Sequence, residues 1–136
     1  MISGVGSDIV EIDRIVQVLA RRGDAFARRI LTPMEYALYL QKNDKPRFLA
    51  KRFAAKEATV KALGTGFREG LSWQHIEISH STLGQPQIQL RERALLLAQQ
   101  KQILRCFLSV SDEQAYSLAF VVMECADPAA NTLLGM

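Results

Sequence analysis

The hydrophobic period changes once near the start of the chain, which predicts a strand followed by a helix. Small and apolar residues alternate over Ile2–Val10, as in a β-strand. Over Glu11–Arg22 the apolar residues recur with the i, i+3, i+4 and i+7 spacing of an amphipathic helix. These apolar residues are Ile12, Ile15, Val16 and Leu19. Gly23 follows and is expected to end the helix.

A second helix start is marked by three residues in close succession. Thr32 suits the cap position, Pro33 the first helical position and Glu35 the third, where its side chain can return to the cap. We expect this helix to run to about Lys42.

The rest of the chain predicts one long helix and then mainly strands. The long helix covers Pro46–Leu63, and Gly64 suits the left-handed residue that commonly follows a helix. The later elements are a hairpin of Ile76–Ile78 and Gln87–Leu90 around Gly84-Gln85-Pro86, a helix over Arg91–Gln102, and β segments Leu104–Ser111 and Tyr116–Glu124 around Asp112–Ala115. This order predicts an α+β fold with an antiparallel sheet packed against helices, as one domain over residues 1–125 with a loosely ordered tail over 126–136.

Composition supports one domain and narrows the class of protein. The chain has 136 residues, 49% of them hydrophobic, which suffices for one core but not comfortably for two. Its 17 basic and 14 acidic residues give a net charge of +3, so no nucleic-acid partner is expected. No apolar run approaches the ~18 residues of a membrane span and no secretory pattern opens the chain, so we expect a cytoplasmic protein without membrane association. Cys106 and Cys125 lie in predicted strands and are expected to be reduced core thiols.

Asp8 stands beside two glycines in the first predicted strand. Gly4, Gly6 and Asp8 share one strand face, while Val5 and Ile9 fall on the other. Glycines weaken a strand, so the pair indicates that something approaches the backbone closely next to Asp8. The competing interpretation is that Asp8 caps the helix that follows.

Glu57 is expected on the inward face of the long helix. At ~100° per residue it shares that face with Ala50, Phe53, Ala54 and Val60. A buried unpaired carboxylate is costly, so Glu57 needs a cation. Lys61, one turn later, could supply that charge in an ordinary ion pair, and Lys56 is expected at a rim.

Together, Asp8 and Glu57 could instead bind one hard divalent cation. Mg²⁺ is typically held by one or two carboxylates, and its other positions are filled by water and substrate phosphates. Lys61 would then be available to a phosphate oxygen. The residues themselves thus indicate a possible phosphoryl-transfer site.

Two segments around these residues resemble a known family. They are GVGSDIVEIDRI at residues 4–15 and RFAAKEATVKALGTG at residues 52–66. Arg29–Thr32 with Glu35, and Phe48–Arg52, fit the same pattern. The chain resembles the holo-[acyl-carrier-protein] synthases, the short class of 4′-phosphopantetheinyl transferases, from about Ile2 to Glu124.

The resemblance implies a reaction and a metal site. Asp8 and Glu57 match the family's Mg²⁺ ligands, and Lys61 matches the lysine near the coenzyme A phosphates. A carrier-protein serine would attack coenzyme A and release adenosine 3′,5′-bisphosphate, a step that serves fatty acid biosynthesis. Two bases remain open for the serine proton: Glu57 through a metal-bound water, and Glu35. The resemblance also implies a homotrimer with active sites between subunits.

Further binding residues follow from the same resemblance. Gly64, Thr65 and Gly66 would lie at the nucleotide-side wall of the coenzyme A site. Ser111 would contact coenzyme A, while Asp112 replaces a histidine found in many members. An acidic helix of the acyl carrier protein would dock on the first predicted helix and its surroundings. The docking residues would be Arg14, Val18, Arg21, Arg22 and Arg28.

Two other classes of protein were weighed against this hypothesis. Gly4 and Gly6 give the start of a dinucleotide-binding motif, but the third glycine position holds Ile9, which excludes that motif. A non-catalytic basic module that docks an acidic protein or RNA would explain the arginines but leave the two carboxylates without a role. His75 and His80 match no metal or triad spacing.

Overall fold

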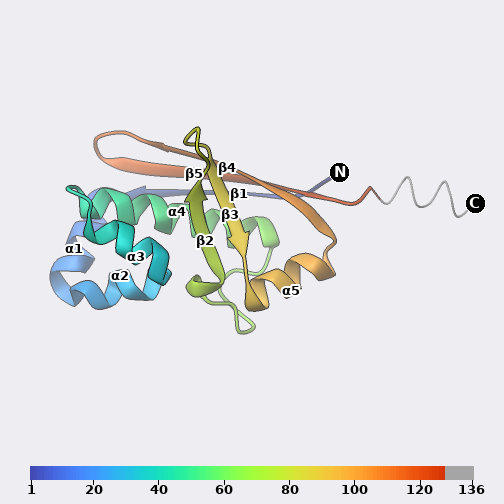
Figure 1. The fold of residues 1–136 in the computed structure, drawn as a ribbon, viewed down its shortest axis with the longest axis horizontal. Helices are drawn as coiled ribbons and strands as arrows, with labels where there is room; N and C mark the ends of the chain where they lie inside the picture. Colours follow the sequence, from blue (N-terminus) through green and yellow to red (C-terminus); the bar gives the residue numbers. More distant parts are fainter. Residues whose placement is uncertain (128–136) are drawn as a thin grey trace, which may run out of the picture.

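The long helix α4 (Lys45–Leu63) lies against a three-stranded antiparallel sheet, and this pair forms the frame of the molecule (Figure 1). The computed structural model describes residues 1–127. Its main sheet has the order β1 (Ile2–Glu11), β5 (Tyr116–Cys125), β4 (Ile103–Asp112). The last strand, β5, therefore lies at the centre of the sheet and pairs with β1 on one side and with β4 on the other.

The remaining elements surround the two ends of α4. Three short helices gather at one end, and a two-stranded antiparallel sheet and a last helix lie toward the other (Figure 1). They are α1 (Ile12–Arg22), α2 (Asp24–Ile30), α3 (Pro33–Leu40), the 3-10 helix η1 (Trp73–His75), β2 (Ile76–His80), β3 (Pro86–Leu90) and α5 (Glu92–Gln100). The α+β class and the antiparallel sheet packed against helices are confirmed.

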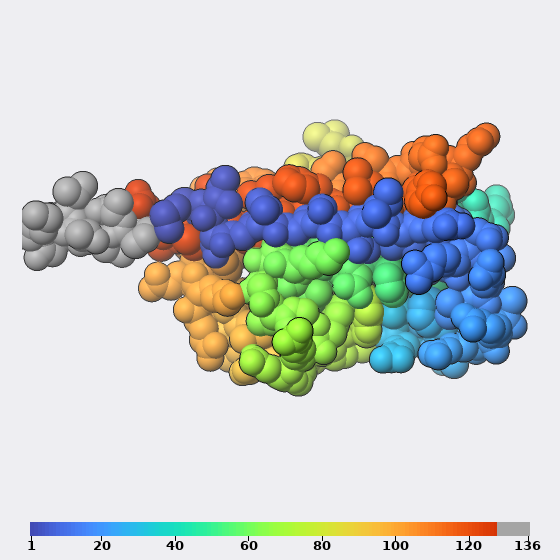
Figure 2. Space-filling view, turned by 180° about the vertical axis from the view of Figure 1, so that it is seen from behind, coloured from blue at the N-terminus to red at the C-terminus, as the bar shows by residue number. Residues whose placement is uncertain are grey.

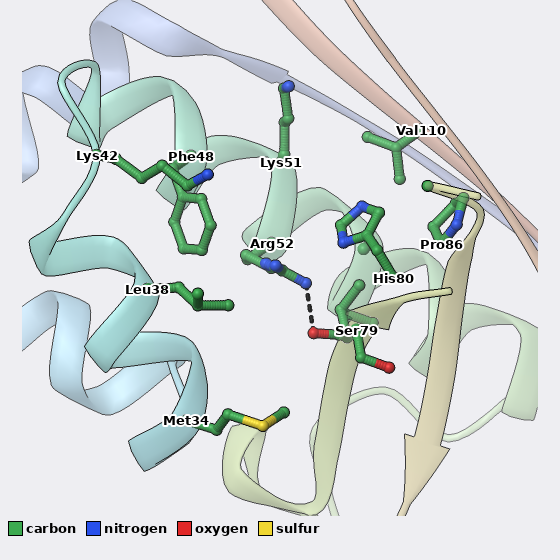
Figure 3. A pocket seen from close by; sticks show the side chains of 13 residues that line it. Met34, Leu38, Lys42, Phe48, Lys51, Arg52, Ser79, His80, Pro86 and Val110 are labelled. Atoms are coloured by element: carbon green, nitrogen blue, oxygen red, sulfur yellow. Dashed lines mark hydrogen bonds between the residues drawn. The ribbon is translucent and has the colours of Figure 1, made fainter. Parts of the chain in front are cut away.

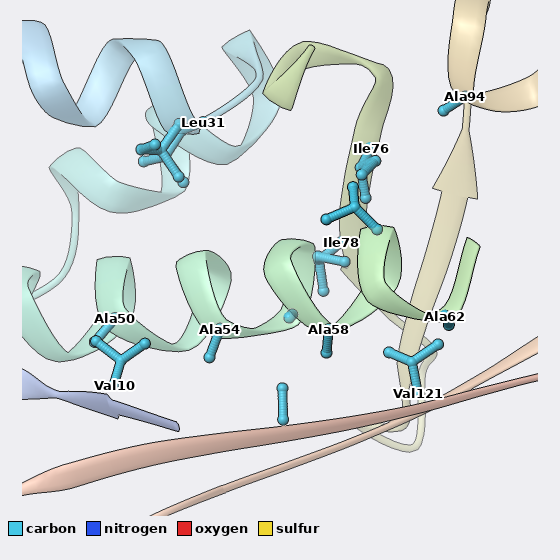
Figure 4. Packing of buried hydrophobic residues seen from close by; sticks show 14 of the residues in the cluster. Val10, Leu31, Ala50, Ala54, Ala58, Ala62, Ile76, Ile78, Ala94 and Val121 are labelled. Carbon is cyan, nitrogen blue, oxygen red and sulfur yellow. The ribbon is translucent and has the colours of Figure 1, made fainter. Parts of the chain in front are cut away.

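Small side chains let the sheet approach α4 closely. Ala54 and Ala58 of α4 have no exposed surface and face the strands, and Val121 of β5, equally buried, faces α4 (Figure 4). On β1 a Cβ added at Gly6 would collide with the carbonyl oxygen of Ala58. The close approach predicted from the two glycines is therefore made by the protein's own helix α4, and Asp8 lies on the same strand face.

Most predicted element boundaries agree with the structure to within a few residues. Thr32 and Glu35 form a reciprocal capping box, and Gly64 follows α4 with a left-handed φ of 83°. Helix α2 was not predicted, because seven residues are too few to establish a helical period. Gly23 ends α1 and immediately caps α2, so the chain turns without a linker. The predicted tail lies mostly outside the described residues.

Two predictions about which helix faces are buried were wrong. Lys56, expected at a rim, has no exposed surface, while Glu57 is only half-buried. The reason is that α4 is covered on one side by the sheet and on the other by α3 and β2, so nearly every face is buried. Val16 of α1, assigned to the apolar stripe, is 42% exposed.

A buried ion pair joins the second covering layer to α4. Lys56 Nζ lies 2.6 Å from Glu35 Oε1 and donates to the carbonyl oxygens of Ile30 and Trp73. Glu35 Oε2 in turn accepts from the backbone N–H of Ile78 at 2.9 Å. The pair thus links α3 and α4 to the end of α2, to η1 and to β2.

Other features agree with the composition. Both cysteines are free, with Cys125 buried and Cys106 partly exposed. Across residues 1–127, no helix is both long and apolar enough to cross a membrane. Figure 2 shows β1 as a continuous band along the surface, with the β4–β5 hairpin on one side and α4 with its following segment on the other.

Candidate active site

Asp8 lies on β1 with its side chain between the strand and α4. The side chain is 17% exposed, and its Oδ1 lies 3.2 Å from the ammonium of Lys61. Its Oδ2 is buried and has no hydrogen-bond partner in the described part of the chain. Burial raises the pKa of Asp8 even though Lys61 opposes the change. Asp8 does not cap α1, because Glu11 occupies the cap position.

Glu57 presents a second carboxylate to the same space. It projects from α4, and burial together with the nearby Asp8 charge raises its pKa. Asp8 and Glu57 both line a cavity of about 360 Å³. Lys61 forms its ion pair with Asp8, and its Nζ also donates to the carbonyl oxygen of Ser7 at 2.9 Å. The simple pair between Lys61 and Glu57 that competed with a metal site is not the one observed.

The two carboxylates fit a magnesium ion better than a metal held entirely by protein. Residues 1–127 contain no cluster of three or more His, Cys, Asp or Glu side chains suited to a metal. The charge of Asp8 disfavours ionisation of Glu57, and Asp8 keeps a buried oxygen without a hydrogen-bond partner among residues 1–127, so a shared cation would stabilise both carboxylates. Mg²⁺ accepts such a sparse protein set because water and phosphates complete its octahedron. Asp8 and Glu57 would hold it.

The basic face of α1 opens directly onto this cavity. Arg14 and Val18 line it together with the two carboxylates. Arg21 and Arg22 are exposed farther along α1, and Arg28 of α2 is exposed with its guanidinium 4.7 Å from the ring centre of Tyr36. Of the predicted docking residues, Arg14 and Val18 therefore lie next to the candidate metal site, and the other three are exposed.

A larger cavity of about 700 Å³ was missed by sequence reasoning. It is cationic, since Lys42, Lys51 and Arg52 line it together with His80 and none of its described lining residues is acidic; its positive charge comes from the lysines and the arginine (Figure 3). Apolar side chains such as Leu38 and Phe48 complete its walls. We call this space the cationic cavity. The basic side chains of such a cavity suit a phosphate group, and its apolar walls suit an aromatic ring of the same ligand.

The cationic cavity and the carboxylates lie on opposite sides of α4. Ala55 faces the cationic cavity and Glu57 faces the smaller one, and residues two positions apart in an α-helix point about 200° away from each other. A ligand in the cationic cavity is therefore separated by the helix from the carboxylates of the same copy.

Four other predicted binding residues lie in neither cavity. Gly64 and Gly66 have left-handed φ angles after α4, and the hydroxyl of Thr65 is buried without a partner within residues 1–127. Ser111 lines a third cavity of about 350 Å³ at the end of β4. Their predicted contacts with coenzyme A remain predictions.

Asp112, which by the resemblance replaces a histidine, is tied to α4 by two ion pairs. Its oxygens lie 2.8 Å from Arg47 Nη1 and 3.4 Å from Lys51 Nζ. The hydrogen bond from Arg47 is the main cause that lowers the pKa of Asp112. Arg47 also donates to the carbonyl oxygens of Glu113 and Gln114, so the β4–β5 turn is fastened to the start of the helix.

The structure argues against Glu35 as the base. Glu35 has no exposed surface, and Lys56, Thr32 and Ile78 occupy its oxygens. It lines none of the cavities described above. Its role is to hold α3 and β2 on α4.

Comparison with known proteins gives consistent matches over most of the chain. A family model described as the 4′-phosphopantetheinyl transferase superfamily matches residues 4–121. The holo-[acyl-carrier-protein] synthase of Vibrio cholerae serotype O1 is 50% identical over 124 residues, 91% of this chain and 98% of the relative. The crystal structure of the Neisseria meningitidis enzyme of that name superposes with a TM-score of 0.85 at 46% identity, covering 91% of this chain and 99% of that one. The Helicobacter pylori enzyme, in complex with coenzyme A, gives 0.77 at 34% identity, covering 88% and 99%.

Proposed function

Since the chain belongs to the 4′-phosphopantetheinyl transferase superfamily, and within it to the holo-[acyl-carrier-protein] synthases, we propose how its own residues perform the transfer. This membership confirms the resemblance predicted from residues 4–15 and 52–66. The chain is a transferase that moves 4′-phosphopantetheine from coenzyme A to apo acyl carrier protein. We further propose that it depends on Mg²⁺, acts in the cytoplasm and supports fatty acid biosynthesis.

One observation carries the proposed metal site: Asp8 and Glu57 line the same cavity, and Asp8 keeps an unpartnered buried oxygen there. Bound Mg²⁺ supplies positive charge that offsets the charge of the pyrophosphate oxygens. Lys61, 3.2 Å from Asp8, would add a second positive charge near the phosphates. The proposed cation site therefore has a basic group beside it.

Glu57 is the proposed acceptor of the serine proton. In the transfer, the serine oxygen bonds to the pantetheine-side phosphorus while the bond from that phosphorus to the bridging oxygen breaks. Adenosine 3′,5′-bisphosphate leaves. Glu57 lies at the cavity wall, where it would take the proton through a metal-bound water, whereas the oxygens of Glu35 are occupied by protein groups.

The carrier protein is proposed to dock on α1. Arg14 and Val18 combine a positive charge with an apolar contact at the cavity, which suits an acidic amphipathic helix. Arg21, Arg22 and Arg28 would extend the positive surface and steer the encounter.

We propose that the complete site forms between two copies of the chain in a homotrimer. The cationic cavity of one copy would hold the nucleotide end of coenzyme A, and Asp8 and Glu57 of its neighbour would act on the pyrophosphate. Two observations support this: the two cavities lie on opposite sides of α4, and the sheet face away from α4 is apolar and exposed. On that face Ile9 is 63%, Phe107 48%, Leu118 45% and Phe120 45% exposed.

The function is tested by the mass of an acyl carrier protein. The chain is incubated with coenzyme A, Mg²⁺ and apo carrier protein, and the carrier is weighed intact by mass spectrometry. We expect a gain of one phosphopantetheine group that disappears when EDTA replaces Mg²⁺. No gain with any apo carrier protein offered would contradict the proposed transfer, and a gain that survives EDTA would contradict the metal.

A further inference from the structure

His80 forms the wall of the cationic cavity opposite α4. It stands at the last position of β2, and Gly84 and Pro86 after the following turn line the cavity beside it. Figure 3 shows its imidazole directed into the space between Pro86 and the side chains of Lys51 and Arg52. The described residues offer its ring nitrogens no hydrogen bond, so both are available to a ligand.

Positive groups face His80 from the elements packed around it. Lys51 and Arg52 face it from α4, and Lys42 from the loop before α4. Three acidic groups on the surrounding elements are already engaged: Asp112 with Arg47 and Lys51, Glu35 with Lys56, and Glu77 with Arg91. The environment of the imidazole is therefore positive until an anion enters.

This environment favours the neutral form of the free imidazole. Burial is the largest cause that lowers the pKa of His80, and the charges of Arg52, Lys51 and Lys42 lower it further. A phosphate in the cavity would oppose the effect of these positive charges on the pKa, because its two negative charges stabilise an imidazolium at hydrogen-bond distance. The ring would then donate to a phosphate oxygen.

We propose that His80 is a phosphate-binding residue of the cationic cavity and that it binds the phosphate as an imidazolium, taking up one proton from solvent. The ligand class is a nucleotide that carries a phosphate monoester. This inference rests on the proposed function, in which the nucleotide end of coenzyme A occupies the cavity. No covalent bond changes, and the transferred proton resides on a ring nitrogen.

The direction of proton exchange distinguishes His80 from the phosphate itself. A phosphate monoester has a second pKa of about 6, and a cationic site lowers it, so the phosphate alone releases protons on binding. Net uptake therefore requires a protein group that gains a proton. His80 is the lining residue whose ordinary pKa lies in this range.

Nuclear magnetic resonance can follow this proton directly, because the chain has only two histidines. The Cε1–H signals of His80 and His75 are titrated with pH, with saturating adenosine 3′,5′-bisphosphate or with adenosine. We expect the bisphosphate to raise the midpoint of His80 by about one pH unit, a tenfold gain in proton affinity, and adenosine to leave it unchanged. His75 is the internal control, since its Nδ1 accepts from the Ser72 N–H outside the cavity.

The substitution His80→Gln provides the matching binding measurement. Calorimetry in two buffers of different ionisation enthalpy should show net proton uptake with the bisphosphate at pH 7.5 for the unsubstituted chain and for His75→Gln. His80→Gln should abolish that uptake. Equal uptake by His80→Gln, an unchanged His80 midpoint in bound protein, or no binding of the bisphosphate would each overturn the inference. A raised midpoint in a protein that transfers nothing would instead support it and refute the proposed function.

Discussion

The two carboxylates of the smaller cavity are placed at a cost to the metal-free protein. Burial raises the pKa of both Asp8 and Glu57, and the charge of Asp8 raises that of Glu57 further. A carboxyl group with a raised folded-state pKa is favourable when protonated, so its contribution to stability is present below the unfolded pKa. That contribution is lost as pH rises through the folded pKa. Above it, the ionised pair destabilises the fold until a cation binds.

Glu57→Gln should therefore stabilise the metal-free protein while abolishing transfer. At pH 7.5 in EDTA we expect a Tm rise of ~2–6 °C, the range for a change of about 1 kcal/mol in a domain of this size. This rise in Tm relative to the unsubstituted chain should disappear as pH falls below 4.5, the ordinary pKa of a glutamate side chain. Thermal denaturation from pH 4 to 8 measures both effects.

A matched control for that substitution is Glu92→Gln at the exposed start of α5. It should lower the free energy of unfolding slightly and leave transfer intact. A Glu57→Gln protein that is less stable than the unsubstituted chain in EDTA, or that still transfers phosphopantetheine, would refute the assigned role.

At the residue scale the sequence singled out two carboxylates that the structure brings to one cavity, but for partly wrong reasons. Asp8 was identified from its glycine neighbours, and that argument stands, although α4 is what approaches them. Glu57 was assigned to a buried helix face, whereas Lys56 is the fully buried charge and Glu57 lies at a cavity wall. Periodicity cannot separate these positions, because a helix covered on most sides has no single polar face.

At the element scale, contact between β1 and α4 fixes the position of Asp8. Gly4 and Gly6 leave no room for a side chain against the backbone of Ala62 and Ala58. The backbone of β1 therefore packs directly against the backbone of α4, without side chains between them at these two positions. As a result, Asp8 reaches the side of α4 that carries Glu57.

Gly6→Ala should push β1 away from α4 and disturb the carboxylate pair. We expect a loss of about 2 kcal/mol or more, because the added methyl group meets backbone that cannot rotate away. Transfer per folded molecule should also fall. Ser7→Ala, on the exposed face of the same strand, should change neither, and urea denaturation with the mass assay tests both. A Gly6→Ala protein as stable and active as Ser7→Ala would contradict the close contact.

The Glu35–Lys56 ion pair is the second contact that fixes how the elements pack on α4. Glu35→Gln should leave the Lys56 ammonium buried without its counter-charge, at a cost of about 3–5 kcal/mol. Chemical denaturation measures this loss. The protein that remains folded at low temperature should still transfer phosphopantetheine, because Glu35 does not reach the cavities. Full stability with lost transfer would mean that Glu35 is the base after all.

Elements with strong end signals were predictable, and short ones were not. The capping box at Thr32 and the left-handed Gly64 fixed two helix ends from local chemistry. Helices α2 and η1 are too short to show a helical period in the sequence. They are held by packing and by the contacts of the buried Lys56 ammonium. Tertiary contacts of this kind cannot be derived from local sequence.

At the scale of the whole molecule, the exposed sheet face is the feature left unexplained by a single copy. Phe120 lies at its centre, between Ser7 of β1 and Ser109 of β4 in the strand register. A contiguous apolar face of this kind is typical of an interface.

Phe120→Glu should break the proposed trimer and abolish transfer together. A buried unpaired charge at three related positions opposes assembly, so we expect a monomer in sedimentation or light-scattering experiments. Leu83→Glu, at a 95% exposed position in the β2–β3 turn, is the control and should remain assembled and active. A monomeric Phe120→Glu protein with full activity would show that one copy suffices.

The cationic cavity could not have been predicted from the sequence. Its charged residues come from the loop before α4, from α4 and from the end of β2, and they are separated by up to 38 positions between Lys42 and His80. No motif joins them. Only the packing of β2 and α3 on α4 brings them to one space.

The central claim is that Asp8 and Glu57 of one copy act on a nucleotide held in the cationic cavity of another. The most direct test mixes two inactive proteins, Glu57→Gln and the double variant Lys42→Glu/Lys51→Glu, after joint refolding from denaturant. Random assembly leaves both halves intact at about one site in four, so transfer should recover to roughly a quarter of the unsubstituted rate. A mixture no more active than its separate components would contradict the claim.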